Sequence, residues 1–519
     1  MPVYPTSIVF EMLIYVRLTD EAGDYLVDED GNYLSGLGWQ DVSADVIAGS
    51  CAWKRGNSGR TIFDRVADIG TLSLVLNNSE FNSHALAGAY SPDNDNVVDG
   101  FGLDTVVRLT ITENGTTHEE WQGKISSITP AFGNYGKQTT QIVCEDWMAN
   151  AYRDRIRGIT VQTNKRDDEL LDILLALASS TPTSTDFSTG DDAYTYALHD
   201  ENSLTSTLAR VFQKIAMSGL GMIFLTGYDT LVYRSRSELL LTGVPEATFS
   251  DDMLNMKVTR KKNQRVKDVF VTTYPVEVDA SAVVLWAARK EVSLTAGESK
   301  TFDVSFRDPS GRNVRVSSTE LTAPVANTDY KFSSTSGSGT DLNASLGITV
   351  ALKSDIATIT LTNNAGVTGY LWFHQQRGKG VYLYEPVTAY GETGQSDGET
   401  INVDMVYQDD QNVGMDIKDL ITYWYLFDQS DVADITFIAN YSQDFMDAAF
   451  LPCGSLVSIQ ESQTGINGNY IVNGVQKKLT SKYILQVTWN LIPANQITGI
   501  WRLDVVGFSE LDSTTKLGA

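Results

Sequence analysis

The chain has 519 residues, of which 42% are hydrophobic and 20% are charged, and this composition excludes an intrinsically disordered protein. Its 65 acidic and 39 basic residues give a formal net charge of −26, which argues against proteins that grip phosphate backbones or anionic lipid through Lys and Arg. From about 100–200 residues per domain, we expect roughly three to five domains.

Cysteine usage and hydropathy exclude several further classes of protein. Cys51, Cys144 and Cys453 lie far apart and form no CxxC motif, so we expect small buried side chains rather than a disulfide frame or a zinc site. No apolar run approaches the ~18 residues of a membrane span, and residues 1–10 lack the basic region of a signal peptide. We therefore expect a chain that is made in a cytoplasm, stays soluble and inserts into no membrane.

The first part of the chain shows almost only β-patterns, and we assign residues 1–150 to a first β-barrel domain. Residues 8–18 and 70–77 are apolar and β-branched runs that predict strands. The Asp30-Gly31 step predicts the turn of a hairpin between Tyr25-Leu26 and Tyr33-Leu34.

An α+β helix–hairpin module is predicted over residues 151–255. Its first helix, at 167–178, carries acidic residues in its first turn, where the helix dipole favours them. Asn202 or Ser203 can cap a second helix, Gly219 can end it, and a hairpin follows it. The apolar face of that second helix, at i, i+4, i+7, i+8 and i+11, consists of Leu204, Leu208, Val211, Phe212 and Ile215.

Residues 256–400 are predicted to be rich in β-structure, with an inserted β-sandwich of short strands over about 283–375. Residues 401–500 are assigned to one helix and a second β-barrel domain, and residues 501–519 to a C-terminal tail. The fold class is therefore mainly β with α+β modules, comprising two tube-type β-barrels, a β-sandwich and a small helix–hairpin domain. The apolar face of the helix after residue 400 consists of Val413, Ile417, Leu420, Ile421 and Trp424.

A strand pattern near the start of the chain returns near its end. Residues 103–145 and 454–491 each read as an alternating strand, a Gly-bearing turn, a strand with a mid-strand glycine, and another alternating strand. The mid-strand glycines are Gly123 and Gly474. Two similar barrels in one chain favour a protein that builds a ring or tube, because each barrel can add its strands to a neighbour's. A chance likeness between two ordinary β-meanders is the alternative.

The sequence carries no catalytic, cofactor-binding or metal-binding motif, and we name no such site. The four histidines, His84, His118, His199 and His374, never pair at helical spacing, and no HExxH, nucleophile elbow, Walker loop or dinucleotide fingerprint occurs. Carboxylates are numerous enough for a glycosidase pair, but solvated acidic faces are the favoured interpretation. Residues 93–100 resemble a calcium loop that lacks its final Glu, and an acidic turn is favoured there.

Arg followed by Gly recurs at strand ends, in Arg55-Gly56, in Arg377-Gly378 and within residues 307–312. Arg can bind carboxylates bidentately across a subunit interface, and ordinary turn chemistry is the favoured alternative. The aromatic residues at 372–373 and 382–384 could stack on sugars, but strand alternation places one of each pair in a core.

Several segments, in this order, resemble the tail hub, or tail-tip (baseplate) hub, proteins of long-tailed bacteriophages. The resemblance covers most of the chain as pattern and order, and no single motif is diagnostic. The matching segments are 52–56 before 70–77, 121–125, 145–147 with the helix before Gly221, and 454–459 with 464–472.

The resemblance implies a structural virion protein that forms a homotrimer. Two barrels per subunit would then make a ring of six, which lets a threefold tail tip dock on a sixfold tail tube. The implied partners are distal tail and tail tube proteins, tail-tip or fibre proteins and the tape-measure protein, with DNA passing through the channel without specific binding. No recognisable peptidase or lysozyme segment occurs, so we expect neither an enzyme nor a cofactor.

Two other functions stay open. A receptor- or carbohydrate-binding tail protein would use the inserted sandwich at 283–375 as its working part. A glycoside hydrolase with accessory β-domains is disfavoured by the lack of an export signal, and a fibre is disfavoured by the lack of heptads or a β-helix period.

Overall fold

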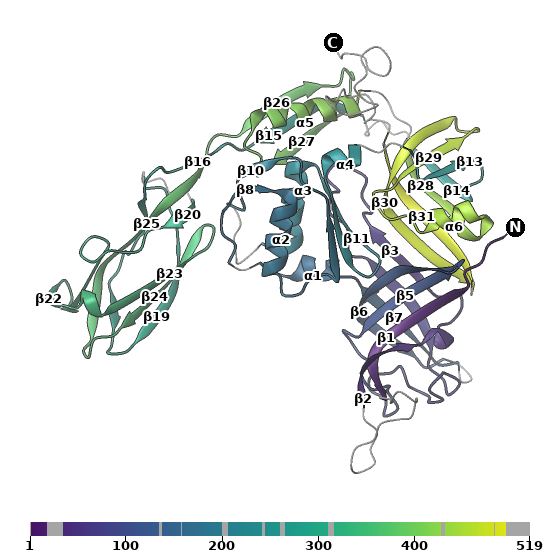
Figure 1. Cartoon of the computed structure of the whole chain (residues 1–519), viewed down its shortest axis with the longest axis horizontal. Coiled ribbons are helices and arrows are strands. Elements are labelled where there is room, and N and C mark those ends of the chain that lie inside the picture. Colours follow the sequence, from purple (N-terminus) through teal and green to yellow (C-terminus); the bar gives the residue numbers. More distant parts are fainter. Residues whose placement is uncertain are drawn as a thin grey trace.

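The computed structural model describes residues 2–17, 35–133, 137–156, 158–199, 206–240, 244–259, 265–309, 316–426, 431–481 and 483–494. Two β-modules lie at one end of the molecule, a helix-containing module lies beside them, and an inserted β-domain projects from the opposite end (Figure 1). The predicted hairpin at Asp30-Gly31 and the predicted tail at 501–519 lie outside the described residues.

The first β-module contributes seven strands to the largest sheet, in the order β3-β4-β7-β6-β5-β1-β2, and all neighbours are antiparallel. Side chains alternate between buried and partly exposed along β4, so the period-two sequence pattern places one face of the sheet on a core. A 3₁₀ turn, η1 (Ser43–Asp45), follows β2. The strands are β1 (Ser7–Arg17), β2 (Ser35–Asp41), β3 (Ala52–Gly56), β4 (Thr71–Asn77), β5 (Val106–Glu113), β6 (Thr116–Ala131) and β7 (Thr139–Glu145).

The second β-module continues the same sheet, because its strand β30 pairs with β3 of the first module. Its own strands follow the order β14-β28-β31-β30-β29-β13. A 3₁₀ turn, η4 (Ala439–Tyr441), and helix α6 (Gln443–Ala449) connect β28 to β29. The strands are β13 (Ala247–Ser250), β14 (Asn255–Thr259), β28 (Asp431–Ile438), β29 (Leu456–Glu461), β30 (Ile466–Ser481) and β31 (Ile484–Pro493).

The two modules repeat one strand topology. Along the chain, β1, β3, β4, β5, β6 and β7 correspond to β13, β14, β28, β29, β30 and β31, and each pairing among the first six has its counterpart among the second six. A β-bulge falls between Ile125 and Ser127 in the β6–β7 pair, and between Val472 and Gly474 in the β30–β31 pair. The modules differ in that β1 is antiparallel to β5 whereas β13 is parallel to β29, and β2 has no counterpart. Shared order, pairing and bulge position exceed what two unrelated meanders would share.

The second repeat takes two of its strands from residues 247–259, far upstream of the segment 401–500. Pairing among the described strands leaves the large sheet open, with β2 and β14 at the two ends of its path. The chain is thus mainly β with several sheets, and closed barrels are not observed within the described residues.

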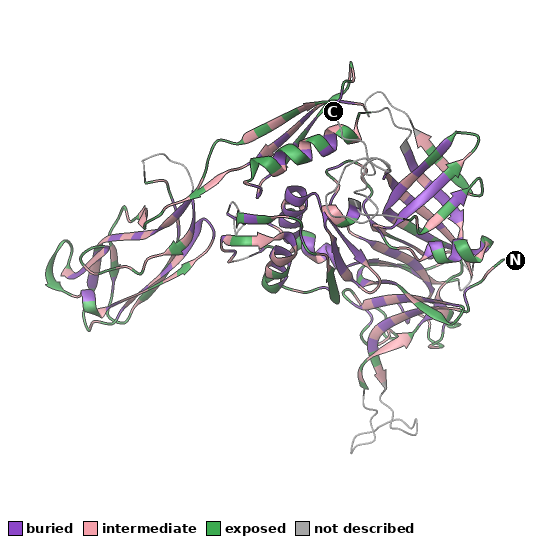
Figure 2. Cartoon of the chain, turned by 45° about the horizontal axis from the view of Figure 1, so that its top comes forward, coloured by how far each residue is buried: buried purple, intermediate pink, exposed green. Residues whose placement is uncertain are grey.

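One hydrophobic core runs through both modules. It contains the fully buried indoles of Trp121 in β6 and Trp489 in β31. Phe249 of β13 lies edge-on to Trp489, with ring centroids 5.5 Å apart. Figure 2 shows buried and intermediate residues alternating along many strands of both modules, as a half-buried sheet requires.

The helix-containing module packs three of its helices, α1, α2 and α3, against two small sheets, β8-β10 and β9-β12-β11. The predicted apolar face of its longest helix is confirmed at Leu208 and Phe212, which are fully buried in the core of this module. The elements are α1 (Met148–Arg153), β8 (Gln162–Arg166), α2 (Asp167–Leu177), β9 (Ser184–Phe187), β10 (Ala193–Ala197), α3 (Leu208–Gly219), β11 (Met222–Thr226), β12 (Thr230–Arg234) and α4 (Arg236–Leu240).

Helix α3 begins later than predicted. Thr207 is its N-cap, and the proposed caps Asn202 and Ser203 lie outside the described residues. The helix ends at Gly219 as predicted, and Leu220 after it adopts a left-handed φ of 54°. No helix within the described ranges is long and apolar enough to cross a bilayer.

Two β-units separate β14 from β28. The first is a sheet of order β26-β15-β27, covered by helix α5 (Gln411–Trp424), whose residues Ile417, Leu420 and Ile421 are buried on the predicted face. The second is an inserted domain of two sheets that share one core, including Phe306, Phe332 and Ile359. The strands of the three-stranded sheet are β15 (Val266–Thr273), β26 (Val387–Glu392) and β27 (Glu399–Met405).

The elements of the inserted domain are β16 (Val276–Val278), β17 (Val283–Ala287), β18 (Val292–Leu294), β19 (Ser299–Ser305), β20 (Ser317–Leu321), β21 (Tyr330–Thr335), β22 (Ser338–Asp341), η3 (Asn343–Ser345), β23 (Leu346–Leu352), β24 (Ile356–Asn363) and β25 (Gly369–Leu383). The long strand β25 pairs with five shorter strands along its length, and β24 forms the centre of the facing sheet.

Candidate functional site

The two β-modules meet where β3 lies antiparallel to residues 474–478 of β30. The backbones approach closely there. A Cβ on Gly56, whose φ is +82°, would lie 2.5 Å from the carbonyl oxygen of Asn473. A Cβ on Gly474 would lie 2.3 Å from the carbonyl oxygen of Asn57. Glycine is required at both positions, which explains the mid-strand Gly474 of the sequence pattern.

A buried ion pair crosses this junction. Lys477 Nζ lies 2.6 Å from Glu120 Oε2, and the two side chains are 7% and 6% exposed. Trp53 Nε1 donates a hydrogen bond of 3.2 Å to the same carboxylate oxygen. The Lys477 ammonium also lies 5.4 Å from the centroid of the Phe450 ring. These contacts join β3, β6 and β30, and removing either charge would leave the other buried and unpaired.

Arg55 ties the junction to the helix-containing module. Its Nη2 lies 3.4 Å from Asp229 Oδ1 at the turn between β11 and β12, and its Nη1 donates to the carbonyl of Gly227. Burial raises the pKa of Asp229 to about 7, against the opposing charge of Arg55. Burial likewise raises the pKa of nearby Asp146 to about 6. Arg55 of the Arg55-Gly56 step therefore joins β3 of the first β-module to the β11–β12 turn of the helix-containing module, within one chain.

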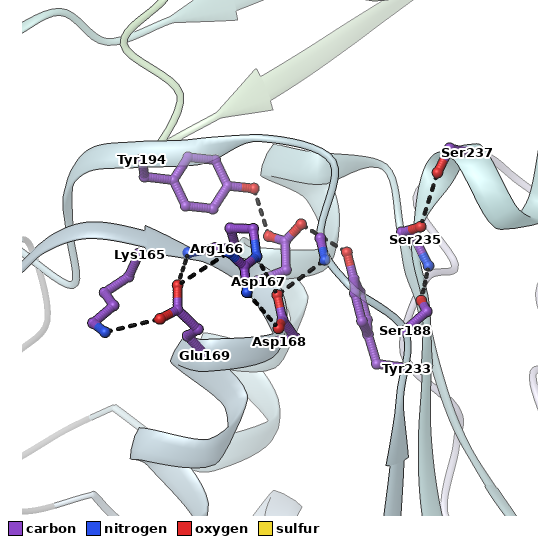
Figure 3. Close-up of polar contacts among 11 residues, drawn as sticks. Lys165, Arg166, Asp167, Asp168, Glu169, Ser188, Tyr194, Tyr233, Ser235 and Ser237 are labelled. Atoms are coloured by element: carbon purple, nitrogen blue, oxygen red, sulfur yellow. Dashed lines mark hydrogen bonds and ion pairs between the residues drawn. The ribbon is translucent and has the colours of Figure 1, made fainter. Parts of the chain in front are cut away.

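The first turn of α2 holds a second polar cluster (Figure 3). Asp167 is buried, and its two carboxylate oxygens accept hydrogen bonds from Tyr194 Oη at 2.5 Å and Tyr233 Oη at 2.7 Å. Burial raises the pKa of Asp167 to about 7, and the two tyrosine hydrogen bonds oppose that rise. The cluster fastens α2 to β10 and β12.

The neighbouring acidic residues of α2 are satisfied locally. Asp168 accepts from Arg166 Nε at 3.1 Å, and Glu169 accepts from Lys165 Nζ at 2.9 Å. Glu169 also accepts from the backbone N–H of Arg166 at 3.1 Å, at the start of the helix. The acidic first turn predicted from the sequence thus stabilises the helix start.

The histidines lie apart and pack on aromatic rings. His118 stacks on Phe450 with ring centroids 3.6 Å apart. The other pairs are His84 with Tyr90, His199 with Tyr407 and His374 with Trp286. Within the described part of the chain, no group of three or more His, Cys, Asp or Glu side chains could hold a metal ion.

The remaining predicted features have local roles. Cys51, Cys144 and Cys453 are free and buried, and burial raises the pKa of Cys453 to about 12. In the predicted acidic turn, the backbone N–H of Asn96 donates to Asn94 Oδ1.

In the inserted domain, Arg377, Trp372 and Tyr382 interact with residues of the same chain. Arg377 binds Asp329 bidentately, with Nε and Nη2 each 2.7 Å from one carboxylate oxygen. The ammonium of Lys331 lies 5.1 Å from the centroid of the Trp372 ring, a cation–π contact. Tyr382 Oη donates a hydrogen bond of 2.8 Å to Asp279 Oδ2. The Arg377-Gly378 step is therefore an intrachain contact as well.

The residues that hold the junction together were missed in the sequence. Glu120 and Lys477 are 357 residues apart, so no local pattern pairs them. The available signal was the position of Glu120, a charged residue directly before the large apolar residue Trp121 in the same strand. Charges inside a core need a partner, and the partner can be identified only in three dimensions.

No model of a known protein family matches the chain. A comparison with curated proteins also finds no match.

Similar solved structures include two prophage or bacterial tail proteins and one secretion component. The 43 kDa tail protein of prophage MuSo2 from Shewanella oneidensis has a TM-score of 0.48 and 8% identity, over 94% of this chain and 99% of that one. A tail protein from Neisseria meningitidis MC58 has a TM-score of 0.46 and 9% identity, over 95% and 99% of the two chains. A type VI secretion component of E. coli, described as similar to T4 tail proteins gp27 and gp5, has a TM-score of 0.35 and 8% identity, over 86% and 74%. The chain is structurally similar to tail proteins, the resemblance indicated by its sequence.

Proposed function

We propose that the chain is a structural protein of a phage tail, and specifically the hub that joins the tail tube to the tail tip. The observation that carries the proposal is the internal repeat, in which six strands recur with the same order and neighbours and with a β-bulge at the same place, although β13 is parallel to β29 where β1 is antiparallel to β5. Three copies of a chain with two like modules would present six like modules. Such a trimer matches a sixfold tube on one side and a threefold tip on the other.

In this proposal both modules are tube-type barrels that surround a channel. Barrel closure would come from strands of neighbouring subunits. DNA carries one negative charge per about 1.7 Å of axis, so a basic wall would retain it through counterion release. With a net charge of −26, the channel-facing surface is expected to be neutral to acidic, and DNA passes without specific binding.

The proposed neighbours are the distal tail and tail tube proteins on one side, and tail-tip or fibre proteins on the other. The tape-measure protein would occupy the channel before DNA does. The location of the chain is then the virion tail. We assign it no catalytic role, and we propose no cofactor or metal for it.

A second candidate function, receptor or carbohydrate contact, is favoured by one observation. The inserted domain projects away from the two β-modules (Figure 1), and its long strand β25 carries the exposed Trp372. A variant lacking residues 276–383 tests this: loss of cell or glycan binding with unchanged self-association would place recognition in the insertion.

The hub proposal is tested by mass and shape in solution. Light scattering coupled to size-exclusion chromatography should give three times the 57.0 kDa of one chain, and electron microscopy should show a ring with a central opening. A stable monomer, or an elongated rod without an opening, would refute the hub.

A further inference from the structure

Among the described residues, the C-terminal half of β6 presents a strand edge without a backbone partner. Residues 124–131 pair with β7 on one side, whereas β5 covers only residues 116–124 on the other side. Beyond Ile125, whose N–H and carbonyl bond to Thr105 and Asp104, no backbone bond from the described residues reaches this edge. Ser126, Ser127 and residues 129–131 are exposed.

Strand β14 presents a second such edge. It pairs with β28 and ends the path of the large sheet, and no strand among the described ranges lies on its outer side. Its counterpart in the first repeat, β3, has partners on both sides, β4 and the C-terminal half of β30. The counterpart of that half of β30 is the unpaired half of β6.

The junction between β3 and the C-terminal half of β30 therefore occurs once inside the chain. The counterparts of its two strands, β14 and the C-terminal half of β6, each have one edge without a strand partner among the described residues. We propose that β14 of one copy pairs with residues 126–131 of β6 in a second copy, by the contact that joins β3 to β30. The inference rests on the proposed function, and it names the surface through which the subunits of the hub assemble.

The repeat sets the register of this seam. The shared bulge makes Ala131 the counterpart of Lys478, and the β4 and β28 pairings make Lys257 the counterpart of Ala52. Since Ala52 faces Lys478 inside the chain, Lys257 faces Ala131 of the next copy.

The side chain that follows β6 supports the same register. Phe132 is 87% exposed, and its counterpart Leu479 is 5% exposed in the shared core. The N–H of Leu479 donates to the carbonyl of Cys51 at 3.0 Å, and the counterpart of Cys51 is Met256 in β14. The seam places Phe132 beside the Met256 thioether of the next copy, a favourable sulfur–aromatic arrangement, and removes the phenyl ring from water.

Pro130 limits what this edge can bind. Proline has no N–H to donate, so an unrelated strand gains less from pairing with the edge, and the seam loses at most one hydrogen bond. The contact is head-to-tail, because the two edges belong to different strands. Such contacts close into a ring when the rotation between copies allows it, and otherwise form an open filament.

Disulfide trapping tests the register. In Lys257→Cys/Ala131→Cys, both new thiols are exposed, and paired residues of adjacent strands lie within the Cα separation of about 4.4–6.8 Å that a disulfide needs. Oxidation should convert the protein into covalent dimers and then closed trimers. The matched control is Lys257→Cys/Ser127→Cys, which moves one thiol four residues, or about 14 Å, along the same edge and should not cross-link. The three native cysteines are buried and contribute little background.

Phe132→Asp provides a readout that does not depend on cross-linking. Because Phe132 is 87% exposed, the melting temperature of the monomer should stay within error of the wild type while the oligomer dissociates at least tenfold more readily. A wild-type protein that stays monomeric refutes the hub and the seam together. An oligomer that neither cross-links in Lys257→Cys/Ala131→Cys nor responds to Phe132→Asp refutes the seam alone. Cross-linking into an unlimited ladder supports the seam and refutes the closed hub.

Discussion

Replacing Lys477 by Met measures the role of the buried ion pair between the two modules. The substitution keeps an unbranched side chain that lacks only the terminal ammonium position, and it leaves the Glu120 carboxylate buried beside Trp53 without its cation. Breaking a buried pair by removing one partner costs about 3–5 kcal/mol, because the remaining charge stays desolvated. We therefore expect the unfolding free energy of Lys477→Met to fall by about that amount.

The matched control is Lys379→Met. Lys379 Nζ lies 3.0 Å from Glu320 Oε2, but these side chains are 39% and 68% exposed. An exposed pair of this kind contributes about 0–1 kcal/mol. A third variant, Lys477→Met/Glu120→Gln, removes both charges and keeps an amide oxygen that can accept the Trp53 hydrogen bond, so it should recover most of the lost stability.

Urea unfolding, followed by tryptophan fluorescence and by circular dichroism, measures all three variants. Two probes are needed because a chain of several modules can unfold in steps. If Lys477→Met proves as mild as Lys379→Met, or if the second substitution restores nothing, the pair does not hold the junction and the reasoning is wrong.

Three further predictions concern the fold. Leu208→Ala should lower the unfolding free energy by about 2–5 kcal/mol, because Leu208 is fully buried in the helix-containing module, and a thermal melt equal to that of the wild type would contradict this packing. The folded pKa of about 7 for Asp167 exceeds the usual ~3.9 of a free carboxyl, so its contribution is complete below about pH 4 and is lost as pH rises to about 7. Asp167→Asn should therefore flatten the decline in stability between about pH 4 and pH 7, and an unchanged slope in urea midpoints would exclude Asp167 as its source. Gly56→Ala should destabilise more than Gly115→Ala, since both have φ near +80° but only Gly56 has backbone within 4 Å of the new Cβ; equal urea midpoints would show that the junction relaxes freely.

The elements predicted from local patterns are mostly present. Alternation over residues 70–77 became β4, and the i, i+4, i+7 spacing after residue 410 became α5 with Ile417 and Leu420 buried. These features depend on neighbours within a few residues, so the sequence alone is informative. The start of α3 was misplaced because caps are short and degenerate signals, and Thr207 occupies the N-cap position although its side chain makes no capping hydrogen bond.

The set of strands that forms the second β-module could not be predicted in the same way. The strands β29, β30 and β31 follow one another and were visible as an echo of β5, β6 and β7. The strands β13 and β14 are separated from β28 by more than a hundred residues, in which a three-stranded sheet and a whole inserted domain fold separately. Strand pairing is non-local, and no periodicity records which distant strand becomes a neighbour.

By itself the sequence determined the mainly β composition, the two similar strand patterns and the absence of recognised catalytic motifs, because each of these depends on residue type and short-range order. Only the tertiary structure decided that Glu120 meets Lys477, that β3 lies against β30, and that two matching edges have no strand partner among the described residues. Those relations arise when distant strands share one sheet and one core. A buried charge, a close backbone approach or an open edge has physical meaning only once its surroundings are known.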